Sequence, residues 1–178
     1  SVFSSHRQKA LPNRMSLSAP KSSTGTRLPF VTYVLAAGVF LMGTTEFIVA
    51  GILPEIAEDL AVSVSDAGLM ITVFAVGMIV GTPAMAALTL RLPRKVTLTL
   101  ALLVFAVGHV IVAMTSILPV ILAARFMTAL ATGAFWAVAA VVGAQAAGPS
   151  LASKALGIVL GGGMLANVVG VPLGAFAG

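Results

Sequence analysis

Five long apolar stretches, separated by short polar connections, make up most of the chain after residue 28. They cover residues 29–53, 67–90, 96–116, 119–147 and 155–178. Each is close to the roughly 20 residues that an α-helix needs to cross the ~30 Å hydrocarbon core of a bilayer. Strands of a membrane β-barrel would be shorter and would alternate apolar with polar side chains. The pattern therefore predicts an all-α, polytopic membrane protein.

The first 28 residues lack this apolar pattern and are rich in Ser, Pro, Lys and Arg. Such a segment cannot bury enough apolar surface to fold, so we expect a disordered, basic tail over 1–28. It is not a secretory signal peptide, because it has no apolar core followed by a small-residue cleavage site. The sequence leaves open whether Ser1 or Met15 is the natural start.

The composition excludes most soluble classes of protein. Apolar residues make up 59% of the chain and charged residues only 8%, whereas soluble domains carry about 25% charged residues. A soluble fold of this length could not cover so much apolar surface, which excludes a water-soluble enzyme and a nucleic-acid binder. The absence of cysteine from the sequence excludes disulfides, iron–sulfur clusters and thiolate zinc sites. We expect no cofactor and no metal, and a lipid bilayer as the surroundings.

The charges in the connections alternate in sign along the chain. Connection 54–66 carries only acids, whereas the tail, connection 91–95 and the connection before 155 carry only bases. Nine of the ten basic residues thus lie on one side of the membrane, which the positive-inside rule identifies as the cytoplasm. We expect a multi-pass protein of the plasma membrane with a cytoplasmic N-terminus. The net charge of +5 then reports orientation rather than an acidic partner.

Three ionisable residues, Glu46, His109 and Arg125, remain inside the apolar stretches. Counted at 1.5 Å per residue from the outer helix ends, all three lie at a depth of about 9–10 Å. Charges inside a membrane are costly and usually functional, so the three residues are candidates for a proton-coupling cluster. The alternatives are a structural Glu46–Arg125 ion pair that never titrates, and a neutral His109 hydrogen-bonded to a neighbouring helix.

Glycine is concentrated in the last apolar stretch. G-x-x-x-G pairs occur at Gly77/Gly81, Gly157/Gly161 and Gly170/Gly174. Such pairs allow helix backbones to approach closely in lipid. The last stretch also contains Pro172 and a run of three glycines, a combination that suggests a helix able to bend or slide at a moving interface.

Two segments near the N-terminal side carry motifs of a known family. In the first stretch the acid Glu46 precedes Leu53-Pro54-Glu55-Ile56-Ala57. The second segment aligns with a loop motif that reads G-x-L-A-D-R-x-G-R-K. The matching residues are Arg91, Arg94 and Lys95, and the departures are Leu90 at the acidic position and Pro93 at the second glycine.

Two further segments follow in the same order as in that family. Arg125 begins an R-x-x-x-G-x-x-x-G pattern in which Ala129 replaces the first glycine and Gly133 supplies the second. The last stretch carries an antiporter signature, whose matching residues are Gly161, Gly170, Pro172 and Gly174.

Through these segments, residues 29–178 resemble the major facilitator superfamily, and within it the proton-coupled drug antiporters of the arabinose-efflux and chloramphenicol-resistance type. The resemblance implies a twelve-helix fold of two six-helix halves around a central cavity. This chain would be a fragment with the first five helices, lacking the sixth helix and the C-terminal half. The implied activity is proton-driven export of a small organic molecule, such as chloramphenicol or a sugar, by a transporter that is monomeric at full length. The resemblance assigns proton coupling to Arg125 and gating to the loop of Arg91, Arg94 and Lys95.

Large or polar side chains in the stretches are candidates to line the substrate cavity. They are Phe47, Met70, Phe74, Trp136 and Asn167. A sugar or nucleoside permease remains an alternative, although it would need more polar cavity residues. An intramembrane enzyme would need paired aspartates, a Ser/His pair or a zinc motif, which the sequence does not provide. An accessory structural subunit would leave the intramembrane charges unexplained.

Overall fold

The computed structural model describes residues 27–89 and 91–177, and in these residues the chain is helical throughout apart from short turns. The helices are α1 (Phe30–Gly51), α2 (Leu53–Asp59), α3 (Val64–Thr89), α4 (Arg94–Ala113), α5 (Leu118–Ala147) and α6 (Ala152–Ala177). All of them except α2 are long and apolar enough to cross a membrane. The predicted all-α membrane fold is confirmed.

The helix ends differ from the expected ranges where local capping decides them. Helix α1 ends at Gly51 because Pro54 restarts the chain as the short helix α2, which the sequence analysis treated as connection. Helix α3 begins at Val64 instead of 67, because Ser63 caps it: the Asp66 amide donates to the Ser63 hydroxyl, and that hydroxyl donates to the Asp66 carboxylate. The acidic connection is therefore shorter and more ordered than the pattern suggested.

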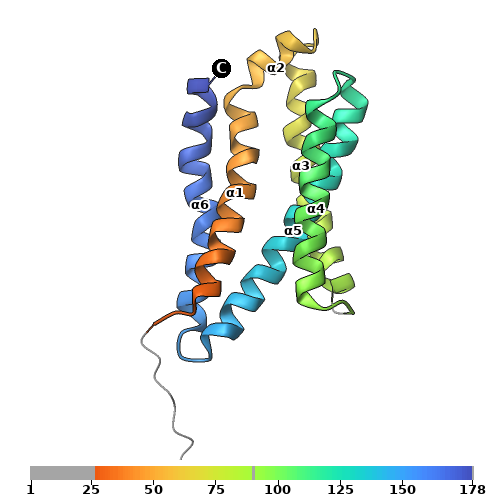
Figure 1. Ribbon diagram of the computed structural model, residues 1–178. Helices are drawn as coiled ribbons and strands as arrows, with labels where there is room; N and C mark the ends of the chain where they lie inside the picture. The colour runs from red at the N-terminus through yellow and green to blue at the C-terminus, as the bar shows by residue number, and fades with distance from the viewer. Residues whose placement is uncertain (1–26, 90, 178) are drawn as a thin grey trace, which may run out of the picture.

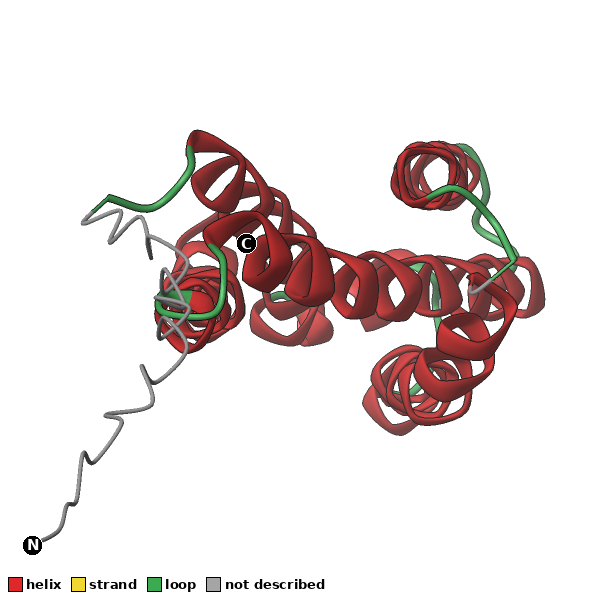
Figure 2. Ribbon diagram, turned by 90° about the horizontal axis from the view of Figure 1, so that it is seen from below, coloured by secondary structure: helices red, strands yellow, loops and turns green. Residues whose placement is uncertain are grey.

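The helices form two groups that α5 joins. Helices α1 and α6 lie side by side along most of their lengths, with their chains running in the same direction (Figure 1). Helices α3 and α4 pack mainly against α5 rather than against each other, and the view along the bundle shows them on different flanks of α5 (Figure 2). Helix α5 also contacts α1 and α6, so it is the central element and has the largest buried share of its surface.

Glycine brings α6 against α1 at backbone distance. A Cβ added to Gly162 would lie 2.4 Å from the Ala36 carbonyl oxygen, and one added to Gly174 would lie 2.5 Å from that of Ile48. Gly170 is as tight, since its Cβ would lie 2.7 Å from the Cβ of Phe47. These glycines, spaced at four or eight residues, form one face of α6, which we call the glycine seam.

The pairs Gly77/Gly81 and Gly157/Gly161 differ: the first contacts a neighbouring helix, and the second lies on an open face of the described chain. Gly77 and Gly81 of α3 meet α5, where added Cβ atoms would lie 2.6 Å from Ala129 and 2.4 Å from Leu130. Around Gly157 and Gly161 the described part of the chain has no atom within 4 Å of an added Cβ. Within the described residues, the prediction that Gly157 and Gly161 bring two helices together is therefore wrong. Helix α6 continues through the exposed Pro172.

Candidate functional site

Glu46 of α1 and Arg125 of α5 form a two-pronged ion pair inside the bundle. The Arg125 Nη1 and Nη2 atoms donate to the Glu46 Oε1 and Oε2 atoms at 2.8 and 2.7 Å. The Arg125 side chain is 3% exposed and that of Glu46 is 11% exposed. A bidentate pair of this kind fixes both side chains and compensates two charges that would otherwise be costly in the membrane. The two residues, predicted from the sequence to lie at one depth, are in direct contact in the structure.

The neighbours of Arg125 hold it in this position. Its guanidinium carbon lies 4.8 Å from the centre of the Phe74 ring, a cation–π distance. Along α5, the Thr128 hydroxyl donates to the Arg125 carbonyl oxygen and the Thr132 hydroxyl to that of Thr128. The Arg125 Nε atom is buried and has no hydrogen-bond partner among the described residues. The guanidinium thus keeps its Nε–H donor unused beside the carboxylate.

A partly open cavity of about 300 Å³ lies beside the ion pair, between α1, α3 and α5. We call it the charged cavity. Its wall includes both members of the pair, and otherwise consists of apolar and small side chains with Thr132 as the remaining polar residue. Of the predicted cavity residues, Phe47, Phe74 and Trp136 line it.

The other two predicted cavity residues lie elsewhere. Met70 is buried, 3% exposed, and is not part of the cavity wall. Asn167 is exposed on α6, whose neighbouring Ala166 and Gly170 face α1 instead. Their positions on the helices, rather than their residue types, keep them away from the cavity.

Trp136 enters a slot between α1 and α6 that two glycines leave open. Added Cβ atoms would lie 2.4 Å from the indole at Gly163 and 3.5 Å from it at Gly43. The indole Nε1 atom is buried and has no hydrogen-bond partner among the described residues. A side chain at Gly163 would therefore displace the indole, whereas one at Gly43 would first meet the Ala166 Cβ, at 2.9 Å.

His109 of α4 stays outside this network. Its Nδ1 atom lies 2.8 Å from the Phe105 carbonyl oxygen of its own helix, and its ring lies 4.2 Å from the Phe105 ring. Its neighbour Gly108 packs on the turn of α5 that carries Arg125, with an added Cβ 2.3 Å from Thr128 and 3.6 Å from the Ala124 carbonyl oxygen. His109 is therefore level with the ion pair, but within the described chain no hydrogen bond joins it to either partner.

The predicted gating loop lies at the end of the bundle opposite to α2 (Figure 1). Arg91, Arg94 and Lys95 are exposed, and Arg94 donates a hydrogen bond to the Gln145 side chain near the end of α5. Pro93 precedes the first residue of α4. Leu90 lies outside the described residues.

Several residues that complete the site were not among those predicted from the sequence. Gly43 and Gly163 shape the slot for Trp136, Thr132 lines the charged cavity and Gln145 holds Arg94. Helical spacing could have identified Thr132, because it lies seven residues after Arg125 and so on the same face of α5. Spacing within one helix could not reveal the role of Gly163 or Gln145, since each contacts a different helix.

A family model, described as Major Facilitator Superfamily, matches residues 35–178. The curated relatives include a chloramphenicol resistance protein of Streptomyces lividans, 42% identical over 85% of this chain and 38% of the relative. They also include the inner membrane transport protein YdhP of Escherichia coli K12, 34% identical over 85% of this chain and 39% of its own length. A probable sugar efflux transporter of Mannheimia succiniciproducens is 34% identical over 84% of this chain and 38% of the relative.

The chain thus spans about two fifths of the length of these relatives. The family match agrees with the resemblance drawn from the motifs, and it identifies the chain with transporters rather than intramembrane enzymes. With a match over most of its residues, the chain belongs to the major facilitator superfamily.

Proposed function

We propose that the transporter containing this chain exports small organic molecules in exchange for protons, by alternating access. The observation that carries the proposal is the buried Glu46–Arg125 pair at the wall of the charged cavity. An ion pair with a purely structural role would need no cavity beside it. Here one cavity presents both the pair and the aromatic side chains that a small organic molecule could contact.

The pair supplies a physical reason for coupling. A carboxylate in a low-dielectric interior is costly unless it is paired, and an unpaired one takes up a proton instead. While Arg125 holds Glu46, the carboxylate is compensated and needs no proton. A movement of α1 against α5 would free the carboxylate to bind a proton, whereas a substrate that donates to the carboxylate in place of Arg125 would keep it unprotonated. Protonation and substrate binding then exclude each other, which is the requirement for exchange.

The cavity wall favours an amphipathic or largely apolar substrate. Its polar groups are few, Glu46 and Arg125 bond to each other, and the Thr132 hydroxyl donates to the Thr128 carbonyl oxygen. A sugar or nucleoside carries many hydroxyl groups that this part of the wall would leave without partners. The name of the Streptomyces relative points in the same direction, although the Mannheimia relative is named for sugar efflux. A chloramphenicol-like molecule is therefore the first candidate, and a sugar the second.

The orientation of the chain in the membrane is part of the same proposal. All the basic residues of the connections lie at the end of the bundle opposite to the acids of α2. The positive-inside rule makes that end cytoplasmic, with the protein in the plasma membrane. Protons would enter Glu46 from the outer side and leave inwards.

The test uses the full-length transporter in proteoliposomes with an outside-acid pH gradient and preloaded substrate. Glu46→Gln removes the proton-binding group but keeps an oxygen that can accept from Arg125, so it should abolish gradient-driven efflux. Glu55→Gln is the matched control, because it removes an exposed carboxylate on α2. The control should transport as the unchanged protein does.

Gradient-driven efflux that survives in the Glu46→Gln protein would overturn the coupling role. A panel of chloramphenicol, other amphipathic drugs, pentoses and nucleosides then decides the substrate class. Transport of pentoses alone would replace the drug assignment with the sugar alternative.

A further inference from the structure

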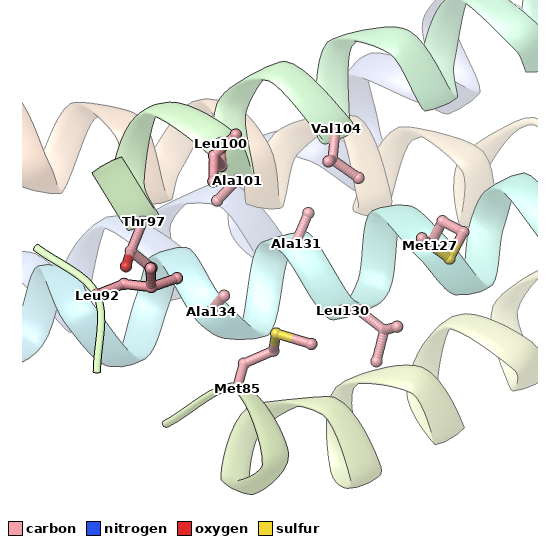
Figure 3. Close-up of a pocket in the computed structure, with 10 residues that line it drawn as sticks. All are labelled: Met85, Leu92, Thr97, Leu100, Ala101, Val104, Met127, Leu130, Ala131 and Ala134. Carbon is pink, nitrogen blue, oxygen red and sulfur yellow. The ribbon is translucent and has the colours of Figure 1, made fainter. Parts of the chain in front are cut away.

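A second hollow lies on the opposite face of α5 from the charged cavity. It is a groove of about 190 Å³ between α3 and α4, with α5 as its floor (Figure 3). Small side chains on the floor and on α4 make the hollow: Ala101, Ala131 and Ala134. Every other wall residue except Thr97 is a large apolar one, and we call the hollow the apolar groove.

The groove begins at the membrane surface and ends near mid-membrane. Figure 3 shows Leu92 and Thr97 at one end and Val104 with Met127 at the other. Leu92 belongs to the turn between α3 and α4, so this end lies where the helices leave the hydrocarbon. From Arg94 to Val104 the helix rises by about 15 Å, at 1.5 Å per residue. One leaflet of a ~30 Å hydrocarbon core has the same depth.

The rim of the groove faces outwards. Leu92 is 42% exposed, Leu100 is 47% exposed and Met127 is 50% exposed. Buried polar groups that could orient a polar ligand are scarce here, since the Thr97 hydroxyl reaches only the Pro93 carbonyl oxygen of its own turn. The groove therefore offers apolar contact along its length.

The surface end of the groove is strongly basic. Leu92 lies between Arg91 and the Arg94-Lys95 pair, and these basic side chains are exposed. The five acids of the chain all lie elsewhere: Glu46 is within α1, and the rest lie at the opposite end of the bundle, in α2 and the first turn of α3. Arg94 bonds to the neutral Gln145, which leaves its charge uncompensated. Positive charge directly above an apolar groove of one-leaflet depth matches an anionic head group on an acyl chain.

We infer that the apolar groove binds an anionic phospholipid of the adjoining leaflet. One acyl chain lies between α3 and α4 on the alanine floor, and the phosphate lies among Arg91, Arg94 and Lys95. The lipid would fill the space that the two helices leave open and would neutralise the loop. Because the site is separate from the charged cavity, the inference does not depend on the proposed transport activity.

Native mass spectrometry of the full-length transporter tests the inference. The protein is incubated with equal amounts of phosphatidylglycerol and phosphatidylcholine that have the same acyl chains, and the ratio of bound lipids is measured. We expect phosphatidylglycerol to be retained preferentially. The double variant Arg91→Gln/Lys95→Gln should lower its preference roughly fivefold per charge removed, the usual contribution of a basic residue beside an anionic surface.

Lys154→Gln is the matched control. Lys154 is an exposed base at the same end of the bundle, near the start of α6 and outside the groove wall. Its removal should leave the lipid ratio unchanged. An equal drop in this variant would overturn the site and show a general attraction of anionic lipid to a basic surface.

A second measurement locates the acyl chain. Phosphatidylglycerol with a photoactivatable acyl chain is cross-linked to the full-length transporter, and the labelled peptides are mapped. Labels on the Leu100 turn of α4 and the Met127 turn of α5 would support the inference. Labels confined to other helices would overturn it, as would inaccessibility of the groove because another segment of the transporter covers it.

Discussion

The α1–α6 contact and the α3–α4 pair show two opposite ways of arranging helices in this chain. Helices α1 and α6 meet at backbone distance, because the glycine seam carries no side chains that would hold them apart. Helices α3 and α4 both pack on α5 but leave the apolar groove between them. In lipid, where burial of apolar groups gives little driving force between helices, close packing decides which helices adhere. The tight contact therefore requires glycine, while the loose pair tolerates large side chains on its rim.

Helix α5 contacts both regions, and it does so through different faces. Arg125 reaches from α5 to Glu46 of α1, across the cavity that separates α1 from α3. The same helix presents Ala131 and Ala134 to the apolar groove on another face. A movement of α1 with α6 against the rest of the bundle would thus break the ion pair before it disturbed the groove.

The largest expected effect on stability comes from removing only one member of the Glu46–Arg125 ion pair. Arg125→Leu leaves the Glu46 carboxylate buried without its partner, and loss of one member of a buried ion pair typically costs about 3–5 kcal/mol. The double variant Glu46→Gln/Arg125→Leu removes both charges and should recover most of that loss. Thermal unfolding of the purified full-length transporter measures both values.

Equal destabilisation by the single and the double variant would contradict this account. It would mean that Arg125 contributes through packing, for example against the Phe74 ring, rather than through the carboxylate.

The second largest expected effect on stability tests the close contact between α1 and α6. Gly174→Ala adds one methyl group 2.5 Å from the Ile48 carbonyl oxygen and 3.1 Å from the Gly51 Cα, both parts of the backbone. A backbone cannot rotate aside as a side chain does, so α6 has to move away from α1. Overpacking of this kind typically costs about 1–3 kcal/mol. Thermal unfolding checks the value, and an unchanged midpoint would show that the seam is looser than described.

The membrane helices and the Glu46–Arg125 pair could be predicted because each can be recognised from positions along the sequence alone. Apolar length predicts a span, and Gly148, whose φ of 76° favours glycine, marks the end of α5 next to the expected residue 147. Depth counted along three helices brought Glu46 and Arg125 to one layer. Charges are rare enough in these stretches that a shared depth already suggested a pair.

The remaining features depend on which face of each helix meets which neighbour. The four-residue spacing of Gly157 and Gly161 is identical to that of Gly170 and Gly174, yet only the second pair lies against α1. Asn167 has the polarity of a cavity residue but lies on an exposed face of α6. Helix rotation is set by contacts between distant segments, so spacing alone could not separate these cases. The Ser63–Asp66 cap, in contrast, was visible in the sequence and was overlooked.

A third, smaller expected effect on stability tests the apolar groove between α3 and α4. Ala131→Leu adds three carbon atoms at a position that lines the apolar groove of about 190 Å³. Since the new atoms enter a hollow rather than a backbone, we expect stability to change by no more than about 1 kcal/mol, with stabilisation favoured. The comparison with Gly174→Ala is direct, because three carbons in the groove should cost less than one in the seam. A loss of 2 kcal/mol or more on the scale of overpacked cores would contradict the open groove.

The smallest effect separates glycines that pack from glycines that do not. Gly161→Ala has the same chemistry as Gly174→Ala on the same helix, but within the described chain nothing lies within 4 Å of the new methyl group. Glycine in a helix interior is less favourable than alanine by about 0.5–1 kcal/mol, so this variant should be neutral or slightly stabilising. Thermal unfolding of the full-length transporter compares the two variants under the same conditions. A loss as large as that of Gly174→Ala would mean that another segment of the whole transporter packs on this face of α6, which would make the face a second seam.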